Sequence, residues 1–309
     1  MGNAVRMFVF QPPNPSSYNV TFNNLPVKFF KIPRGKKDEF MYAFHIDCGA
    51  SQTMLYSHGN AEDLGGIYKN LAKKSIRWQI NIFAYEYSGY GPCADREPSE
   101  MHLYEDIEAA YSFLVKFKGL SPQSIIPFGR SLGSGPTCHL ATKYNFKAII
   151  LQSAFASIAK VIMRINLPFR GGIFDNLSKL PNISSKILII HGIDDGLVPF
   201  SHAQMLYNAA PLRSNTIWIK NAGHNNVELV ASEEYYSRIA HFLKEVFLCD
   251  GSYPFCKSST ITSLPAHRPY YTTSANSTEQ FADVTQYSDA NVSSVKHFAQ
   301  RYQSLQELR

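Results

Sequence analysis

Short apolar runs alternate along the chain with segments whose apolar residues recur at helical spacing. The apolar runs, each suited to a buried strand, cover 54–61 with its terminal loop, 80–87, 125–128, 148–153, 187–192 and 216–219. The helical pattern covers 64–78, 99–116, 137–144 and 227–247. Buried strands that alternate with amphipathic helices are typical of a mostly parallel sheet with helices on both faces. The chain is therefore expected to adopt an α/β fold.

Two stretches near the start show a different pattern, because apolar and polar residues alternate in them. They are Val20–Ile32 and Phe40–Ile46, with the turn-prone Arg34–Asp38 between them. Alternation predicts half-buried strands, and the turn predicts that they pair in antiparallel fashion. We expect this pair at one edge of the sheet.

Composition narrows the class of protein. The 309 residues are 45% hydrophobic and 13% aromatic, enough for a substantial core, and the formal charge of +6 comes from scattered basic residues. That scatter argues against nucleic-acid binding. The five cysteines show no metal-ligand spacing, which predicts reduced thiols, and no motif calls for a metal or an organic cofactor. No signal peptide and no membrane-spanning run is expected.

A motif for nucleophilic chemistry follows the third of these apolar runs. Gly129-Arg130-Ser131-Leu132-Gly133 fits G-x-S-x-G, between an apolar run and a helical segment. A sharp turn between strand and helix exposes the serine hydroxyl and places it before a helix N-terminus, whose N–H groups favour negative charge. The glycines are needed because side chains there would collide with neighbouring elements. Ser131 is the candidate nucleophile.

The partners that a serine nucleophile needs follow later in the chain. A base must take the hydroxyl proton, and a carboxylate must orient that base. Asp195 follows the run 187–192 in an H-G-x-x-D-x-x-V-P pattern, and His224 follows the run 216–219. Ser, Asp, His is the order that the α/β-hydrolase arrangement requires. Asp194 remains an alternative to Asp195.

Two backbone donors are expected to hold the oxyanion that forms during acyl transfer. Leu132 follows the nucleophile directly and supplies one N–H group. The loop His58-Gly59-Asn60 after an early strand supplies the other, most plainly from Asn60. His58 is interpreted as a residue that braces this loop, because it precedes the nucleophile in the chain.

Five blocks together resemble the alpha/beta hydrolase domain-containing protein 17 family. They are HGNAEDLG, IFAYEYSGYG, GRSLGSGPT, HGIDDGLVPFSH and AGHNNVEL, and the likeness runs from about Phe8 to Leu248. The resemblance implies an α/β-hydrolase fold with a small cap segment at about 156–184. It also implies a serine hydrolase that removes palmitoyl groups from S-palmitoylated, membrane-attached proteins, with Ser131, Asp195 and His224 as its triad.

The sequence departs from that family at two places. Animal members carry an N-terminal cysteine cluster that is palmitoylated, whereas this chain has none, so a myristoylated Gly2 would have to provide contact with the cytoplasmic face of membranes. Arg130 stands where the family usually has Gln. The domain boundaries we predict are an extended segment over 1–19, a hydrolase domain over 20–249 and a polar, disordered tail over 250–309.

Two other functions stay open. A small-molecule lipid esterase that cleaves lipid esters such as monoacylglycerols or lysophospholipids uses the same triad. A non-catalytic interaction protein on a hydrolase scaffold is the third class. Apolar residues of the cap segment, among them Ile158, Ile162, Leu167, Phe169 and Phe174, either line an acyl groove or pack on the sheet.

Overall fold

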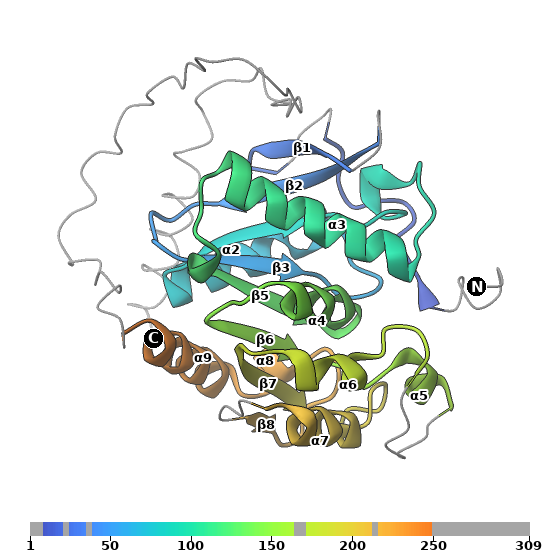
Figure 1. Ribbon diagram of the computed structural model, residues 1–309, viewed down its shortest axis with the longest axis vertical. Helices are drawn as coiled ribbons and strands as arrows, with labels where there is room; N and C mark the ends of the chain where they lie inside the picture. The colour runs from blue at the N-terminus through green and yellow to red at the C-terminus, as the bar shows by residue number, and fades with distance from the viewer. Residues whose placement is uncertain (1–8, 21–24, 35–38, 164–170, 212–215, 249–309) are drawn as a thin grey trace.

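An eight-stranded sheet forms the centre of the protein (Figure 1). The computed structural model describes residues 9–20, 25–34, 39–163, 171–211 and 216–248. The strand order is β1-β2-β4-β3-β5-β6-β7-β8. The strands are β1 Phe29–Pro33, β2 Phe40–Ile46, β3 Thr53–Ser57, β4 Asn81–Tyr85, β5 Ile125–Arg130, β6 Ala148–Gln152, β7 Lys186–Gly192 and β8 Ile217–Ile219.

The pairing of the strands sets where the site lies. β1 pairs with β2 and β2 with β4 in antiparallel fashion, whereas β3 to β8 run parallel to one another. The expected antiparallel edge pair is therefore confirmed, although β1 begins at Phe29 and is shorter than the predicted stretch Val20–Ile32. Because the carboxyl ends of β3 to β8 meet at one edge, the loops that follow them gather there; we call this the site edge.

Helices cover both faces of the sheet. The main ones are α2 Leu64–Trp78, α3 Glu100–Ser112, α4 Ser134–Lys143, α7 Phe200–Ala209 and α9 Ser232–Leu248. Helices α3, α4 and α7 cover the face turned to the viewer in Figure 1, and their apolar residues share one core with the sheet. Helices α2 and α9 contribute to a second core on the other face. The expected α/β-hydrolase fold, a mostly parallel sheet between two helical layers, is confirmed.

Local sequence explains where several helices begin. Asp63 caps α2 by accepting from the Gly66 N–H at 3.0 Å, and Ser99 caps α3 by accepting from the His102 N–H at 3.1 Å. The predicted helix over 99–116 continues past α3 as a π-helical turn, Phe113–Phe117. These caps and the apolar stripes behind them make the helices predictable from sequence.

Two helical features differ from the prediction. Helix α7 was not expected, because a buried polar residue, His202, interrupts its short apolar pattern. The single helix expected over 227–247 consists of α8 Val227–Val230 and α9, which are separated at Ala231.

The segment proposed as a cap contains two short helices. These are α5 Ile158–Met163 and α6 Asn176–Lys179. Phe174 is fully buried, and Ile158 and Ile173 pack against the core, whereas Ile162 is 45% exposed. Most of the described apolar residues of this segment therefore pack on the body of the protein. Leu167 and Phe169 lie outside the described residues.

Several expectations concern parts of the chain that the structure does not describe. Gly2 and the 250–309 tail are among them, so myristoylation and the tail boundary stay predictions. Within 9–20, Val9, Phe10 and Tyr18 are buried against the hydrolase body. In the described ranges, no helix has the length and apolarity to cross a bilayer.

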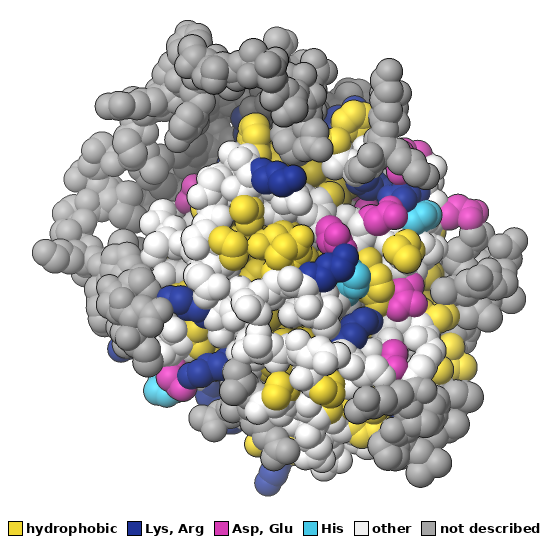
Figure 2. Space-filling view, in the orientation of Figure 1, with side chains coloured by type: hydrophobic (Ala, Val, Ile, Leu, Met, Phe, Trp, Pro, Cys, Tyr) yellow, Lys and Arg dark blue, Asp and Glu magenta, His cyan; other side chains and the backbone are white. Residues whose placement is uncertain are grey.

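The surface carries mixed charge. On the face shown in Figure 2, Lys and Arg side chains lie among Asp and Glu side chains, and hydrophobic side chains form small separate groups. This distribution matches the scatter of basic residues along the sequence. Cys48, Cys93 and Cys138, the cysteines within the described ranges, are unpaired thiols.

Candidate active site

Ser131 occupies the sharp turn between β5 and α4. Its φ of +49° lies in the left-handed region that L-residues rarely adopt, at a cost of about 1–3 kcal/mol. A β-carbon at Gly129 would lie 2.6 Å from the Gly133 carbonyl oxygen, and one at Gly133 would overlap the carbonyl oxygen of Ser57. Both glycines of the motif are thus required by close packing around the serine turn.

His224 lies between the two other candidate residues. It follows β8, its Nε2 is 2.8 Å from Ser131 Oγ, and its Nδ1 is 2.8 Å from Asp195 Oδ2. Since a carboxylate only accepts, Nδ1 carries the proton, which leaves Nε2 to accept from the serine hydroxyl. The structure therefore brings Ser131, His224 and Asp195 into one hydrogen-bonded chain, although they are distant in sequence.

Asp195 is held as a carboxylate in the loop after β7. Its Oδ1 accepts from the N–H groups of Leu197 at 2.9 Å and Val198 at 2.8 Å. Its Oδ2 also lies 3.3 Å from Nε2 of His191. Burial alone would raise the pKa of Asp195, but the hydrogen bonds from His191 and His224 hold it well below its usual range. Asp194, the alternative, is exposed to solvent.

Comparison with known proteins gives the family. Over 213 residues the chain is 37% identical to alpha/beta hydrolase domain-containing protein 17C of Xenopus laevis, covering 68% of each chain. Over 221 residues it is 37% identical to alpha/beta hydrolase domain-containing protein 17B of Homo sapiens, covering 69% of this chain and 74% of the relative.

The chain belongs to the alpha/beta hydrolase domain-containing protein 17 family. The resemblance seen in the sequence is thereby confirmed. Among solved structures, an esterase of Pyrococcus furiosus shares the fold with a TM-score of 0.61 at 18% identity, covering 77% of this chain and 97% of the esterase. No protein-family model matches the chain.

The expected oxyanion loop lies beside the serine turn of this family member. The side chain of Asn60 donates to Val9 O at 2.8 Å and accepts from Gln11 N–H at 2.9 Å and Tyr90 O–H at 2.6 Å. Among the described residues its backbone N–H has no acceptor, as an oxyanion donor requires. Leu132, the other expected donor, is buried directly after Ser131. The roles of Asn60 and Leu132 stay predictions.

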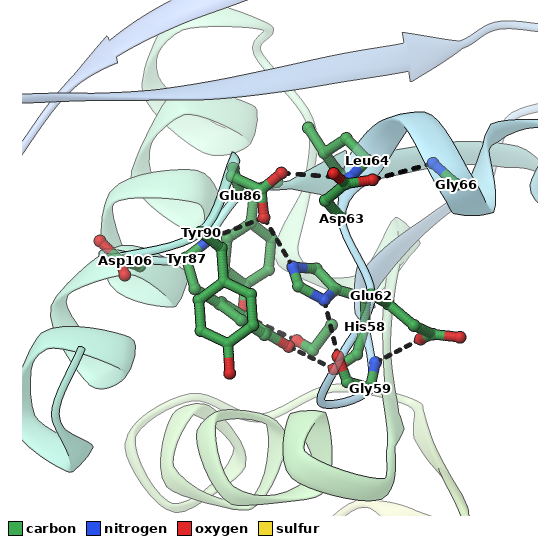
Figure 3. Close-up of polar contacts among 12 residues, drawn as sticks. His58, Gly59, Glu62, Asp63, Leu64, Gly66, Glu86, Tyr87, Tyr90 and Asp106 are labelled. Atoms are coloured by element: carbon green, nitrogen blue, oxygen red, sulfur yellow. Dashed lines mark hydrogen bonds and ion pairs between the residues drawn. The ribbon is translucent and has the colours of Figure 1, made fainter. Parts of the chain in front are cut away.

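A buried ion pair supports the start of this loop (Figure 3). His58 Nε2 lies 3.0 Å from Glu86 Oε1, and its Nδ1 lies 2.9 Å from Gly59 O. Tyr87 stacks on the imidazole with ring centroids 3.9 Å apart, and its hydroxyl donates to His58 O at 2.7 Å. His58 thus braces the loop, as the sequence indicates.

Several residues around the site have no motif that identifies them. His191 donates from Nε2 to Val198 O at 2.8 Å while contacting Asp195, so it orients the carboxylate loop. The Gly59 N–H donates to Glu62 at 2.7 Å, and Glu62 in turn pairs with Arg130. The sequence offers one signal for this pair, since Arg130 lies inside the G-x-S-x-G motif, directly before Ser131. In the part of the chain that the structure describes, no cluster of His, Cys, Asp and Glu is suited to a metal ion.

Proposed function

We propose that the protein is a serine hydrolase that cleaves acyl thioesters and esters through Ser131, His224 and Asp195. The observation that carries this proposal is His224, which has Ser131 Oγ at 2.8 Å on one nitrogen and the carboxylate of Asp195 at 2.8 Å on the other. A base so oriented activates a serine hydroxyl, which is a poor nucleophile alone.

The reaction proceeds in two steps. Ser131 Oγ attacks the acyl carbonyl carbon while His224 Nε2 takes the hydroxyl proton, and the oxyanion accepts from the N–H groups of Leu132 and Asn60. The carbon–sulfur bond then breaks, leaving a serine ester and a thiolate that takes the proton from His224. Water next attacks the ester, giving its proton to His224, which returns it to Ser131 as the acid leaves.

The proposed substrates are long-chain acyl groups on cysteines of membrane-attached proteins. Support comes from the family resemblance and from the site edge, where exposed apolar side chains lie close to the loops of the site. Leu197 is 59% exposed two residues after Asp195, and Leu229 is 78% exposed in α8, five residues after His224. Such a rim favours peripheral contact with a membrane.

Labelling with a fluorophosphonate probe tests the nucleophile, because the probe reacts with activated serines. We expect the probe to label wild type and not to label Ser131→Ala. We also expect the substitution to lower kcat at least about 10³-fold. Ser237→Ala, which changes an exposed serine of α9 whose hydroxyl donates to Glu234 O, is the matched control and keeps its label. Labelling that persists in Ser131→Ala at unchanged stoichiometry would refute the nucleophile.

The same two proteins assayed on a substrate panel test the leaving group. We expect a higher kcat/KM for a palmitoylated cysteine peptide than for a monoacylglycerol with the same acyl chain. The reverse order would identify a lipid esterase. A folded wild type that neither labels nor turns over any substrate would support the non-catalytic class.

A further inference from the structure

Arg130 is the last residue of β5 and directly precedes Ser131. Its side chain is 13% exposed. From Nη1 it donates to Glu62 Oε1, and from Nη2 it donates to Asn225 Oδ1 at 2.8 Å. One side chain beside the candidate nucleophile thus contacts residues that are 68 and 95 positions away in the sequence.

The contact with Glu62 reaches the oxyanion loop. The second carboxylate oxygen of Glu62 accepts the Gly59 N–H at 2.7 Å, so the backbone directly before Asn60 is tied to Arg130 through one carboxylate. Gly59 leaves the room for this, because a β-carbon there would lie 2.8 Å from Glu62 Oε2 and 3.0 Å from Arg130 Nη1. The glycine of the HGN loop is thereby explained by the bridge to Arg130.

The contact with Asn225 reaches the histidine loop. Asn225 is adjacent to His224, and the next residue, Asn226, closes the loop by accepting the Gly223 N–H at 2.7 Å. The guanidinium therefore joins the loop after β3 to the loop after β8, at the end of β5 directly before Ser131. The guanidinium is planar, so its N–H donors point in fixed directions toward the two acceptors. A lysine ammonium has no such fixed pair of directions.

We infer that Arg130 is a positioning residue that sets the oxyanion loop and the histidine loop relative to Ser131. The inference rests on the proposed hydrolase function. Displacement of a reacting group by about 1 Å can reduce the rate about 10²-fold. Loss of the contacts that Arg130 makes should therefore lower kcat more than it changes KM. A glutamine at this position would be too short and uncharged to make both contacts.

Hydrogen–deuterium exchange tests the positioning without requiring activity. In Arg130→Gln we expect faster amide exchange in both 58–62 and 222–226, and in Arg130→Lys in only one of them. Arg96→Gln is the matched control, since Arg96 is similarly buried at 11% exposure and pairs with Glu39 and Glu105 away from both loops. Unchanged exchange in both loops of Arg130→Gln would overturn the inference, whether or not the protein proves to be an enzyme.

Kinetics give the second readout. We expect Arg130→Gln to lower kcat about 10- to 100-fold with KM within about twofold, and Glu62→Gln to lower kcat less. The double variant should be no slower than Arg130→Gln alone, because both changes break one bridge. A lowered melting temperature with wild-type kcat, as expected for Arg96→Gln, would show a merely structural ion pair. Absence of fluorophosphonate labelling in wild type would count against the hydrolase function alone.

Discussion

At the scale of single residues, a buried partner shifts the pKa of His58. Its imidazole is fully buried, 3.0 Å from Glu86 Oε1, while the Tyr18 hydroxyl donates to Glu86 Oε2 at 2.8 Å. Burial alone would lower the pKa of His58, but the hydrogen bond and the negative charge of Glu86 raise it above its ordinary value. The loop that holds Asn60 therefore begins at a buried pair in which Glu86 favours the protonated form of His58.

This pair predicts a pH dependence of stability. Because the pKa of His58 is raised on folding, its contribution is complete below the unfolded value of about 6.5 and is lost as the pH rises through the folded value. We expect the free energy of unfolding of wild type, measured with urea, to fall from pH 6 towards pH 9. His58→Gln loses about 3–5 kcal/mol at pH 6, because the buried Glu86 carboxylate loses its counter-charge. Equal pH slopes in variant and wild type would contradict the assignment.

At the scale of elements, helix α8 depends on α2. Four residues are too few for a stable isolated helix. Glu228 of α8 accepts from Lys74 Nζ at 2.5 Å and from Asn70 Nδ2 at 2.8 Å, both on α2. Burial would raise the pKa of Glu228, but the charge and hydrogen bond of Lys74 lower it to about 2. The histidine loop thus ends at a buried ion pair.

Breaking this tie should destabilise the protein strongly. Glu228→Gln leaves the buried Lys74 ammonium without its counter-charge, so we expect a loss of about 3–5 kcal/mol in urea unfolding at pH 7. Glu233→Gln, which removes an exposed pair between α9 and Arg77 of α2, should cost less than about 1 kcal/mol. Similar losses in the two variants would show that the pair with Lys74 contributes no more than a surface contact.

The same pair has a defined pH window. A depressed carboxyl pKa stabilises the fold above the unfolded value of about 4.5, and this contribution is lost as the pH falls from there towards about 2. Between pH 5 and pH 3, wild type should therefore lose more stability than Glu228→Gln.

At the scale of the whole molecule, exposed apolar side chains concentrate at the site edge. Of the seven large ones among the described residues, five lie there: Met101, Ile162, Leu197, Leu229 and Val230. Phe117 and Tyr144 lie at the opposite edge, where α3 and α4 end before β5 and β6. In Figure 1, α9 ends at this opposite edge. This polarity supports the proposal that the site edge faces a lipid surface.

Vesicle flotation tests this orientation with unacylated protein. Removing the apolar contact of one leucine should cost up to about 1.5 kcal/mol, or about tenfold in partition. We therefore expect Leu197→Asp and Leu229→Asp to reduce binding to phosphatidylserine-containing vesicles. Phe117→Asp, which adds the same charge at the opposite edge, is the control and should bind like wild type. If Phe117→Asp reduced vesicle binding as much as the two leucine substitutions, the added negative charge alone would account for the loss, and the orientation would be contradicted.

The sequence by itself determined the strands, the long helices other than α7, and the candidate triad. Apolar periodicity and caps such as Asp63 and Ser99 are local signals, so strands and long helices follow from neighbouring residues. Ser131, Asp195 and His224 each follow a predicted strand, and parallel strands bring their carboxyl ends to one edge whatever the length of chain between them. The order and placement of these residues could therefore be inferred without coordinates.

Only the tertiary structure decided what surrounds those residues. Arg130 and Glu62 are 68 residues apart, and Lys74 and Glu228 are 154 apart, so no local pattern relates the members of either pair. His191 is a polar residue inside an apolar strand, and its contact with Asp195 depends on how the loop after β7 turns back. Long-range contacts between charged side chains depend on how distant elements pack together. The periodicity of apolar residues reports only local structure, so it does not predict these contacts.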